Sequence, residues 1–127
     1  MEKNGVVSLW IGKVINAEEL DRLLTISYSD EGDYIRSIFA EYFKIIRYDD
    51  DLREAEYYEN KVDNFYQLLE DFSYDYNVIS EFKKVTEELP ENINVAILLY
   101  DFEYNGKVVQ ATIQSNYLQF VGSIKYK

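Results

Sequence analysis

The sequence predicts an α+β fold: an antiparallel sheet of about four strands with helices packed on one face. Strand-like runs occupy both ends of the chain, and apolar residues at the three- and four-residue spacing of helices fill the middle. An Asn-Gly pair near the C-terminus adds a hairpin signal. The 127 residues approach the ~150 residues of one typical domain, so we expect a single domain over residues 1–127.

The first strand is expected to lead directly into the first helix. Val6–Gly12 is an apolar run that ends at a glycine, which is typical of a short strand. Asn16 and Glu19 then have the spacing of a capping box in which Asn16 caps the helix. The apolar stripe of that helix consists of Leu20, Leu23 and Leu24.

Three more apolar stripes predict three more helices in the middle of the chain. The second stripe consists of Ile35, Ile38, Phe39, Tyr42, Phe43 and Ile46, the third of Val62, Phe65, Tyr66, Leu69 and Phe72, and the fourth of Val78, Phe82, Val85 and Leu89. The fourth helix is expected to stop before Pro90, because proline lacks the backbone N–H that a helix uses.

The C-terminal segment predicts three strands, at Asn94–Tyr104, Lys107–Ile113 and Tyr117–Tyr126. Asn105-Gly106 favours a two-residue hairpin between the first two, because these residues readily take positive φ angles. The three strands are therefore expected to form a meander. The strand at Val6–Gly12 is expected to join them, because an isolated strand leaves its backbone groups unpaired.

Charge and residue usage exclude several classes of function. The chain has 13 Lys and Arg against 24 Asp and Glu, a net charge of -11, whereas nucleic-acid binding requires clustered cations. We therefore expect a basic partner and no nucleic acid. The absence of Cys and His removes thiolate nucleophiles, the Ser-His-Asp triad and the commonest metal ligands. Phosphate-binding loops and the Gly-x-Ser-x-Gly nucleophile motif are also missing, and the Ser80-x-x-Lys83 spacing is interpreted as helix surface, so we predict no enzymatic activity, no cofactor and no metal.

The start of the chain and its longest apolar run indicate the cellular location of the protein. The chain begins without the apolar core of a signal peptide, and its longest apolar run, Val95–Tyr100, has six residues where a membrane helix needs ~20. We expect a cytoplasmic protein with no membrane partner.

Residues 104–127 contain three Lys and no acid. An exposed sheet edge in that segment leaves two states open, a monomer or a weak homodimer.

The densest acidic segment runs from Tyr48 to Glu59 and is rich in tyrosine. One interpretation is a solvated helix start, capped by Asp50 or Asp51, in which the acids complement the helix dipole. A compatible interpretation is a protein-binding surface, where carboxylates pair with Lys and Arg of a partner and tyrosines supply rigid contact area. The predicted partner-binding residues are Tyr48, Asp49, Asp50, Asp51, Glu54, Tyr57 and Tyr58.

Two other features have a structural and a functional interpretation. Residues 101–106 match the beginning of a calcium-binding EF-hand loop, but Thr112 stands where that loop needs a glutamate, so a hairpin is favoured. Trp10 shares a strand face with Ser8 and Gly12, and core packing is favoured over a role as a binding anchor.

Several segments match a family pattern in order along nearly the whole chain. They are Ser8-Leu9-Trp10-Ile11-Gly12, Ala17-Glu18-Glu19-Leu20, Ser37-x-Phe39, Phe43-x-Ile45, Tyr48-Asp49-Asp50-Asp51-x-x-Glu54-Ala55, Leu98-Leu99-Tyr100-Asp101 and Phe120-Val121-Gly122-Ser123. In this combination the chain resembles the immunity protein 22 family of bacterial polymorphic-toxin systems. It departs from the expected pattern at Ile38 and Tyr42, where we would expect a proline and an aspartate.

The resemblance implies a small cytoplasmic protein that binds and neutralises a cognate toxin domain and has no enzymatic activity. The acidic composition agrees with this, because toxins that attack nucleic acid are often basic. We predict that the acidic, tyrosine-rich segment makes the contact. The alternative is an acidic protein-binding adaptor without a toxin partner, and a hydrolase built on paired carboxylates is a third interpretation.

Overall fold

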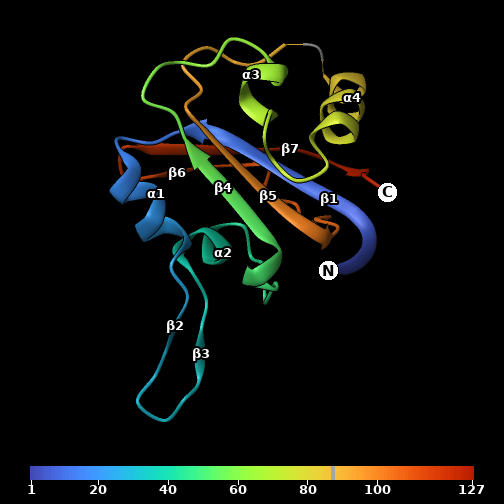
Figure 1. Ribbon diagram of the computed structural model, residues 1–127. Helices are drawn as coiled ribbons and strands as arrows, with labels where there is room; N and C mark the ends of the chain where they lie inside the picture. Colours follow the sequence, from blue (N-terminus) through green and yellow to red (C-terminus); the bar gives the residue numbers. More distant parts are fainter. Residues whose placement is uncertain (87) are drawn as a thin grey trace.

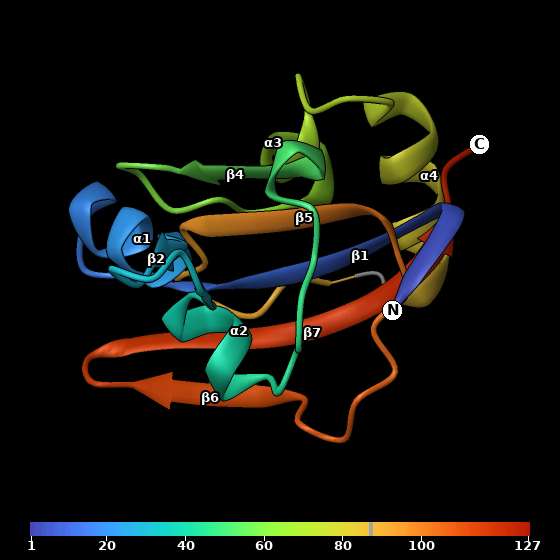
Figure 2. The same cartoon turned by 90° about the horizontal axis from the view of Figure 1, so that it is seen from below.

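The computed structural model describes residues 1–86 and 88–127, and its centre is a five-stranded antiparallel sheet (Figure 1). The strands of this sheet are β1 (Glu2–Lys13), β4 (Arg53–Tyr57), β5 (Val95–Phe102), β6 (Gln110–Ile113) and β7 (Asn116–Lys125). Their order is β4-β5-β1-β7-β6, so β4 and β6 lie at opposite edges (Figure 2). The α+β class is confirmed, with one strand more than the four expected.

Besides the five-stranded sheet, the described residues form four short α-helices and a small hairpin. They are α1 (Ala17–Leu24), α2 (Ile38–Tyr42), α3 (Phe65–Leu69), α4 (Asp75–Val85) and the two-stranded hairpin of β2 (Ser27–Tyr28) and β3 (Tyr34–Ile35). In Figure 1, α3 and α4 lie together at the top, apart from α1 and α2. None of these helices has the length and apolar character needed to cross a bilayer.

The helices cover both faces of the sheet, so the expectation of helices on one face is wrong. One buried cluster joins the Trp10 face of β1 to α1 and α2, and a second joins the opposite face to α3 and α4. The reason lies in the central strands. In β1 and β5 the side chains of both faces are apolar, and Leu9 and Trp10 are both fully buried on opposite sides.

Trp10 is a core residue with no exposed surface. Its ring centroid lies 5.0 Å from that of Phe39 and 5.0 Å from that of Phe120, with Tyr104 at 5.2 Å and Phe43 at 5.8 Å. These rings come from α2, the α2 C-cap, the connection after β5 and strand β7, so Trp10 joins segments that are far apart in the sequence. The core interpretation is therefore confirmed.

The hairpin expected at Asn105-Gly106 is wrong. β5 ends at Phe102, and the next strand, β6, pairs with β7 at the far edge of the sheet. Tertiary contacts explain why the chain passes from β5 to the far edge of the sheet without a tight turn. The Ser8 hydroxyl accepts the N–H of Tyr104 at 3.0 Å, and the Tyr104 hydroxyl donates to the Val108 carbonyl at 2.6 Å. The tight turn is instead the two-residue connection at 114–115 between β6 and β7. The pairing of these two strands agrees with the meander that the sequence predicts.

The first helix is confirmed, and the other three are shorter than expected. Asn16 caps α1, and its Oδ1 accepts the Glu19 N–H at 2.9 Å. The second stripe is divided between β3 and α2, which Ser37 caps, and Ile46 beyond it is 84% exposed. The third stripe is reduced to α3. The fourth helix ends at Val85, before the expected end at Leu89, and residue 87 lies outside the described residues.

Candidate functional site: an acidic cleft beside the edge strand

The acidic segment is not a helix start, so that interpretation is wrong. Residues 50–52 form a single 3-10 turn, and the chain then enters β4 at the sheet edge. Asp49 is the cap, because its Oδ1 accepts the N–H of Asp51 at 3.0 Å. The residues of β4 alternate with period two: Ala55 and Tyr57 pack against the α1/α2 cluster, and Glu54 and Glu56 are not part of it.

Part of the segment lines a cleft of about 480 Å³ between the β2–β3 hairpin, the 3-10 turn and the ends of β1 and β5. We call it the acidic cleft. Its carboxylate residues are Glu2, Asp49, Asp50 and Asp101, and its tyrosines include Tyr28, Tyr34 and Tyr48. Arg47 is the one basic residue among the described residues that line it.

The interior of the acidic cleft is built around the Tyr34 ring. The guanidinium carbon of Arg47 lies 4.2 Å from the Tyr34 ring centroid, and the Tyr28 ring meets Tyr34 edge-on at 6.1 Å. The Tyr34 hydroxyl is buried and has no hydrogen-bond partner among the described residues. Burial raises the pKa of Tyr34 above its usual value, so the phenol stays neutral and can donate a hydrogen bond.

Three of the predicted residues meet at this cleft in different roles. Tyr48 is only 6% exposed, and its hydroxyl accepts a hydrogen bond from Arg53 Nη1 at 3.2 Å, so it supports the wall. Asp49 and Asp50 line the opening with exposed side chains. Asp51 is exposed beside them and does not line the cleft.

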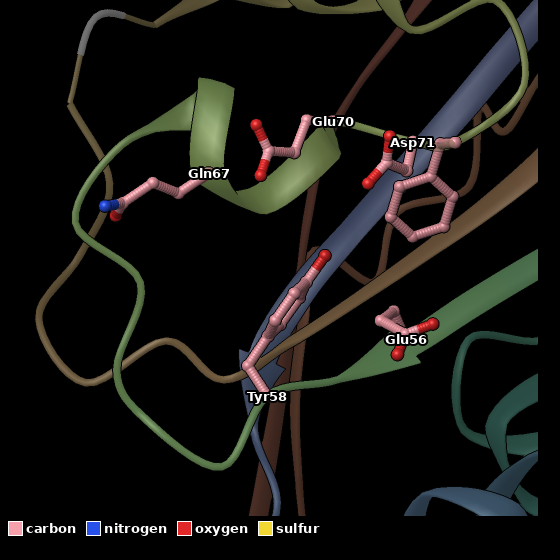
Figure 3. Close-up of a pocket in the computed structure, with 6 residues that line it drawn as sticks. Glu56, Tyr58, Gln67, Glu70 and Asp71 are labelled. Carbon is pink, nitrogen blue, oxygen red and sulfur yellow. The ribbon is translucent and has the colours of Figure 1, made fainter.

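The other predicted residues lie along β4. Glu54 is held by Ser73, whose N–H donates to its Oε1 at 2.9 Å. Tyr57 lines a groove between α1 and β4. Tyr58 reaches a pocket of about 270 Å³ beneath α3, with Glu56, Glu70 and Asp71 around it (Figure 3). Tyr58 donates to the Leu68 carbonyl at 2.5 Å, and burial, followed by nearby carboxylates, raises its pKa to about 12.

Carboxylates that lie close enough together to hold a cation occur at the 3-10 turn. Asp49, Asp50 and Asp51 offer oxygens that lie within 4.8 Å of one another, and all three side chains are exposed.

The EF-hand-like residues do not converge on a common point. Asp101 Oδ1 accepts the Gly5 N–H at 2.8 Å and the Tyr126 hydroxyl at 2.7 Å, whereas Glu103 pairs with Lys3 at 3.4 Å. These two hydrogen bonds lower the pKa of Asp101.

Sequence reasoning missed the side chains that the fold adds to the acidic cleft. Glu2, Tyr28, Tyr34 and Arg47 come from three separate segments. The only local signal is the pair of tyrosines on either side of the turn between β2 and β3. Their arrival beside Asp49 depends on tertiary packing, which sequence spacing does not encode.

Comparison with known protein families gives a match over most of the chain. The family model described as Immunity protein 22 matches residues 7–127, which is nearly the whole chain. Neither the curated proteins nor the solved structures give a match. The family match includes β4 and the Asp49–Asp51 turn, together with most of the residues that line the acidic cleft. The chain therefore belongs to the Immunity protein 22 family.

Proposed function

We propose that this chain is an immunity protein that binds a cognate bacterial toxin domain in the cytoplasm and neutralises it without enzymatic activity. The family membership over residues 7–127 carries this proposal. The acidic cleft supports it, because four carboxylate residues surround a space lined by tyrosines in a protein of net charge -11. Such a surface fits a basic toxin and gives a chemical reason for the binding.

The acidic cleft would act by receiving a Lys or Arg side chain of the toxin. Asp49 and Asp50 would attract the cation at the opening, and the exposed ring of Tyr28 would stack on its aliphatic part or its guanidinium. Arg47 already occupies a face of the Tyr34 ring. Inhibition would follow either from covering the toxin's active site or from binding beside it. Because the carboxylates are exposed, association should weaken as salt concentration rises.

The experiment that tests the function is a rescue by co-expression. The gene immediately upstream is expressed in bacteria with and without this chain, and surviving cells are counted. Toxicity that only this chain relieves would support the proposal. A harmless neighbour, or toxicity that persists, would contradict it and favour the acidic adaptor without a toxin partner.

The acidic cleft is tested by a charge substitution that preserves the local fold. Asp49→Asn with Asp50→Asn keeps the capping oxygen of Asp49 and removes two negative charges. We expect the affinity for the toxin domain to fall at least about tenfold, or about 1.4 kcal/mol. The matched control, Glu88→Gln with Glu91→Gln, removes the same charge from exposed positions outside the acidic cleft. Equal affinities of the two double variants would contradict this assignment.

A further inference from the structure

The edge strand β4 leaves one side of its backbone without a strand partner. In the sheet order β4-β5-β1-β7-β6, β4 pairs with β5 only. The register pairs Ala55 with Ile97 and Tyr57 with Val95, and the Tyr58 N–H continues it by donating to the Asn94 carbonyl at 2.8 Å. Antiparallel pairing alternates, so Glu54 and Glu56 bond to β5, whereas the backbones of Ala55 and Tyr57 face away.

The groups that face away have no partner within the described part of the chain. The Arg53 N–H is used by the 3-10 turn, where it donates to the Asp50 carbonyl. The Arg53 carbonyl and the N–H and carbonyl groups of Ala55 and Tyr57 make no hydrogen bond to another described residue. An open row of this kind is a template for pairing with another extended segment.

The space beside this row can hold such a segment. A groove of about 660 Å³ runs along β4 and is flanked by α1 on one side and by Asp71 and Phe72 on the other. We call it the edge groove. On the α1 side it is lined by Ala17, Leu20, Asp21 and Leu24, and it meets the Tyr58 pocket at Glu56, Asp71 and Phe72. Arg53 is the one basic residue among the described residues that line it, and its Nη1 donates to the Leu24 carbonyl at 2.8 Å. One flank is therefore largely apolar and the other acidic.

The charges beside the edge groove indicate what kind of segment it can bind. Glu56, Glu70 and Asp71 line the Tyr58 pocket, and no Lys or Arg is among the described residues that line it (Figure 3). The side chains of an added strand alternate between the two flanks. Basic side chains would enter the acidic flank, and apolar side chains would pack on the α1 side, where Ala17 is exposed beside the buried Leu20 and Leu24.

We propose that the edge groove binds an extended segment of the toxin domain as a sixth strand beside β4, and that this segment alternates Lys or Arg with apolar residues. The proposal rests on the proposed function and names its binding mode. Main-chain hydrogen bonds to Ala55 and Tyr57 would supply affinity, and the acidic flank would select a basic segment. The acidic cleft lies next to the groove, since Leu52 is followed directly by Arg53.

A second copy of this chain fits the edge groove poorly. Antiparallel pairing of two β4 strands about Ala55 places Glu54 directly opposite the partner subunit's Glu56, and the same contact occurs twice by symmetry. Like charges in direct opposition destabilise a strand pair. The acidic edge thus discourages self-association and leaves the backbone free for a basic segment.

Hydrogen exchange in the intact complex tests the proposal. The amide exchange rates of the free protein are compared with those of its complex with the upstream-encoded toxin domain, whose catalytic residue has been substituted. We expect the amides of Ala55 and Tyr57 to exchange rapidly in the free protein and at least about tenfold more slowly in the complex. Gln110 and Thr112 lie on β6 at the opposite edge and should keep their rates.

A pair of proline substitutions gives a matched second test. In Ala55→Pro the lost N–H faces away from β5, so the fold loses no hydrogen bond. Thr112→Pro is the control, because its N–H faces away from β7 in the same way at the other edge. We expect Ala55→Pro to weaken toxin binding at least about tenfold and Thr112→Pro to leave it within about twofold.

The outcomes separate the binding mode from the function. A complex that forms and protects cells while the amides of Ala55 and Tyr57 stay unprotected would overturn strand addition and leave the immunity function standing. Failure of the rescue itself would overturn both. A homodimer of the free protein that Ala55→Pro dissociates would show that a second copy occupies the edge, which also overturns the proposal.

Discussion

The carboxylate of Glu54 accepts two hydrogen bonds from Ser73, one from its backbone N–H at 2.9 Å and one from its hydroxyl. Ser73 lies in the turn between α3 and α4, so this contact joins the edge strand to the helices of one face. The backbone carbonyl of the same serine accepts the hydroxyl of Tyr100 at 2.6 Å. Glu54 therefore holds the flank of the edge groove in place.

We expect Glu54 and Ser73 to be coupled in stability. A double-mutant cycle with Glu54→Ala and Ser73→Ala should give a coupling free energy of about 1 kcal/mol, because the serine hydroxyl bonds to a charged acceptor. The measurement is urea unfolding of the four proteins. Glu56→Ala with Ser73→Ala is the control cycle and should be additive within about 0.5 kcal/mol. Additivity in the Glu54 cycle would contradict the prediction.

Gly12 is expected to be indispensable for pairing between β1 and β7. A Cβ atom at this position would lie 1.9 Å from the carbonyl oxygen of Tyr117 and 2.9 Å from the Cα of Leu118. Because these are backbone atoms, Gly12→Ala should destabilise the protein by more than about 4 kcal/mol or prevent folding. Gly32→Ala is the contrast, since φ is +85° but the space is open, and it should cost about 1 kcal/mol. Thermal unfolding compares them, and similar midpoints would contradict the packing argument.

The sequence predicts the elements whose signals are local. Asn16 caps α1 as its spacing indicates, and the alternation of Leu9 and Trp10 correctly divides the two faces of β1. By contrast, β4 contains Glu54 and Glu56 on one face, so an edge strand with one polar side resembles a solvated helix start. Asn105-Gly106 carries a strong turn signal, but contacts of Ser8 with Tyr104 override it.

The candidate site is predictable only in part, because some of its residues are brought together by tertiary packing. Asp49 and Asp50 stand out as charges in a tyrosine-rich segment, and both line the acidic cleft. Tyr34 reaches it on the β2–β3 hairpin, and Arg47 reaches it from the connection between α2 and the 3-10 turn. The open backbone of Ala55 depends on strand order, which is a property of the whole sheet.

Trp10 is expected to be the largest single contributor to the α1/α2 cluster. Trp10→Ala would remove a fully buried ring from contact with four aromatic rings and leave a cavity. We expect a loss of about 3–5 kcal/mol in the free energy of unfolding, measured with urea. Tyr76→Ala is the control, because that ring is 85% exposed, and it should change stability by less than about 0.5 kcal/mol. A similar loss in both variants would contradict the cluster assignment.

Alkaline pH is expected to unfold the protein through its buried tyrosines. Tyr58, Tyr100 and Tyr126 each donate a hydroxyl hydrogen bond, to the Leu68 carbonyl, the Ser73 carbonyl and the Asp101 carboxylate. Burial is the largest cause that raises all three pKa values, to about 12 for Tyr58. An unfolded tyrosine has a pKa of about 10, so their stabilising contribution is complete below about pH 10.

As pH rises from about 10 toward about 12, the unfolded chain releases protons that the folded chain retains, and the free energy of unfolding should fall. Urea unfolding at increasing pH measures this, with phenolate absorbance followed in parallel. Tyr58→Phe should cost about 1 kcal/mol at neutral pH and make the alkaline fall shallower. Tyr76→Phe, at an exposed position, should leave the pH profile unchanged. A flat profile for the parent protein would contradict the role of the buried phenols, because folded and unfolded chains would then bind the same number of protons.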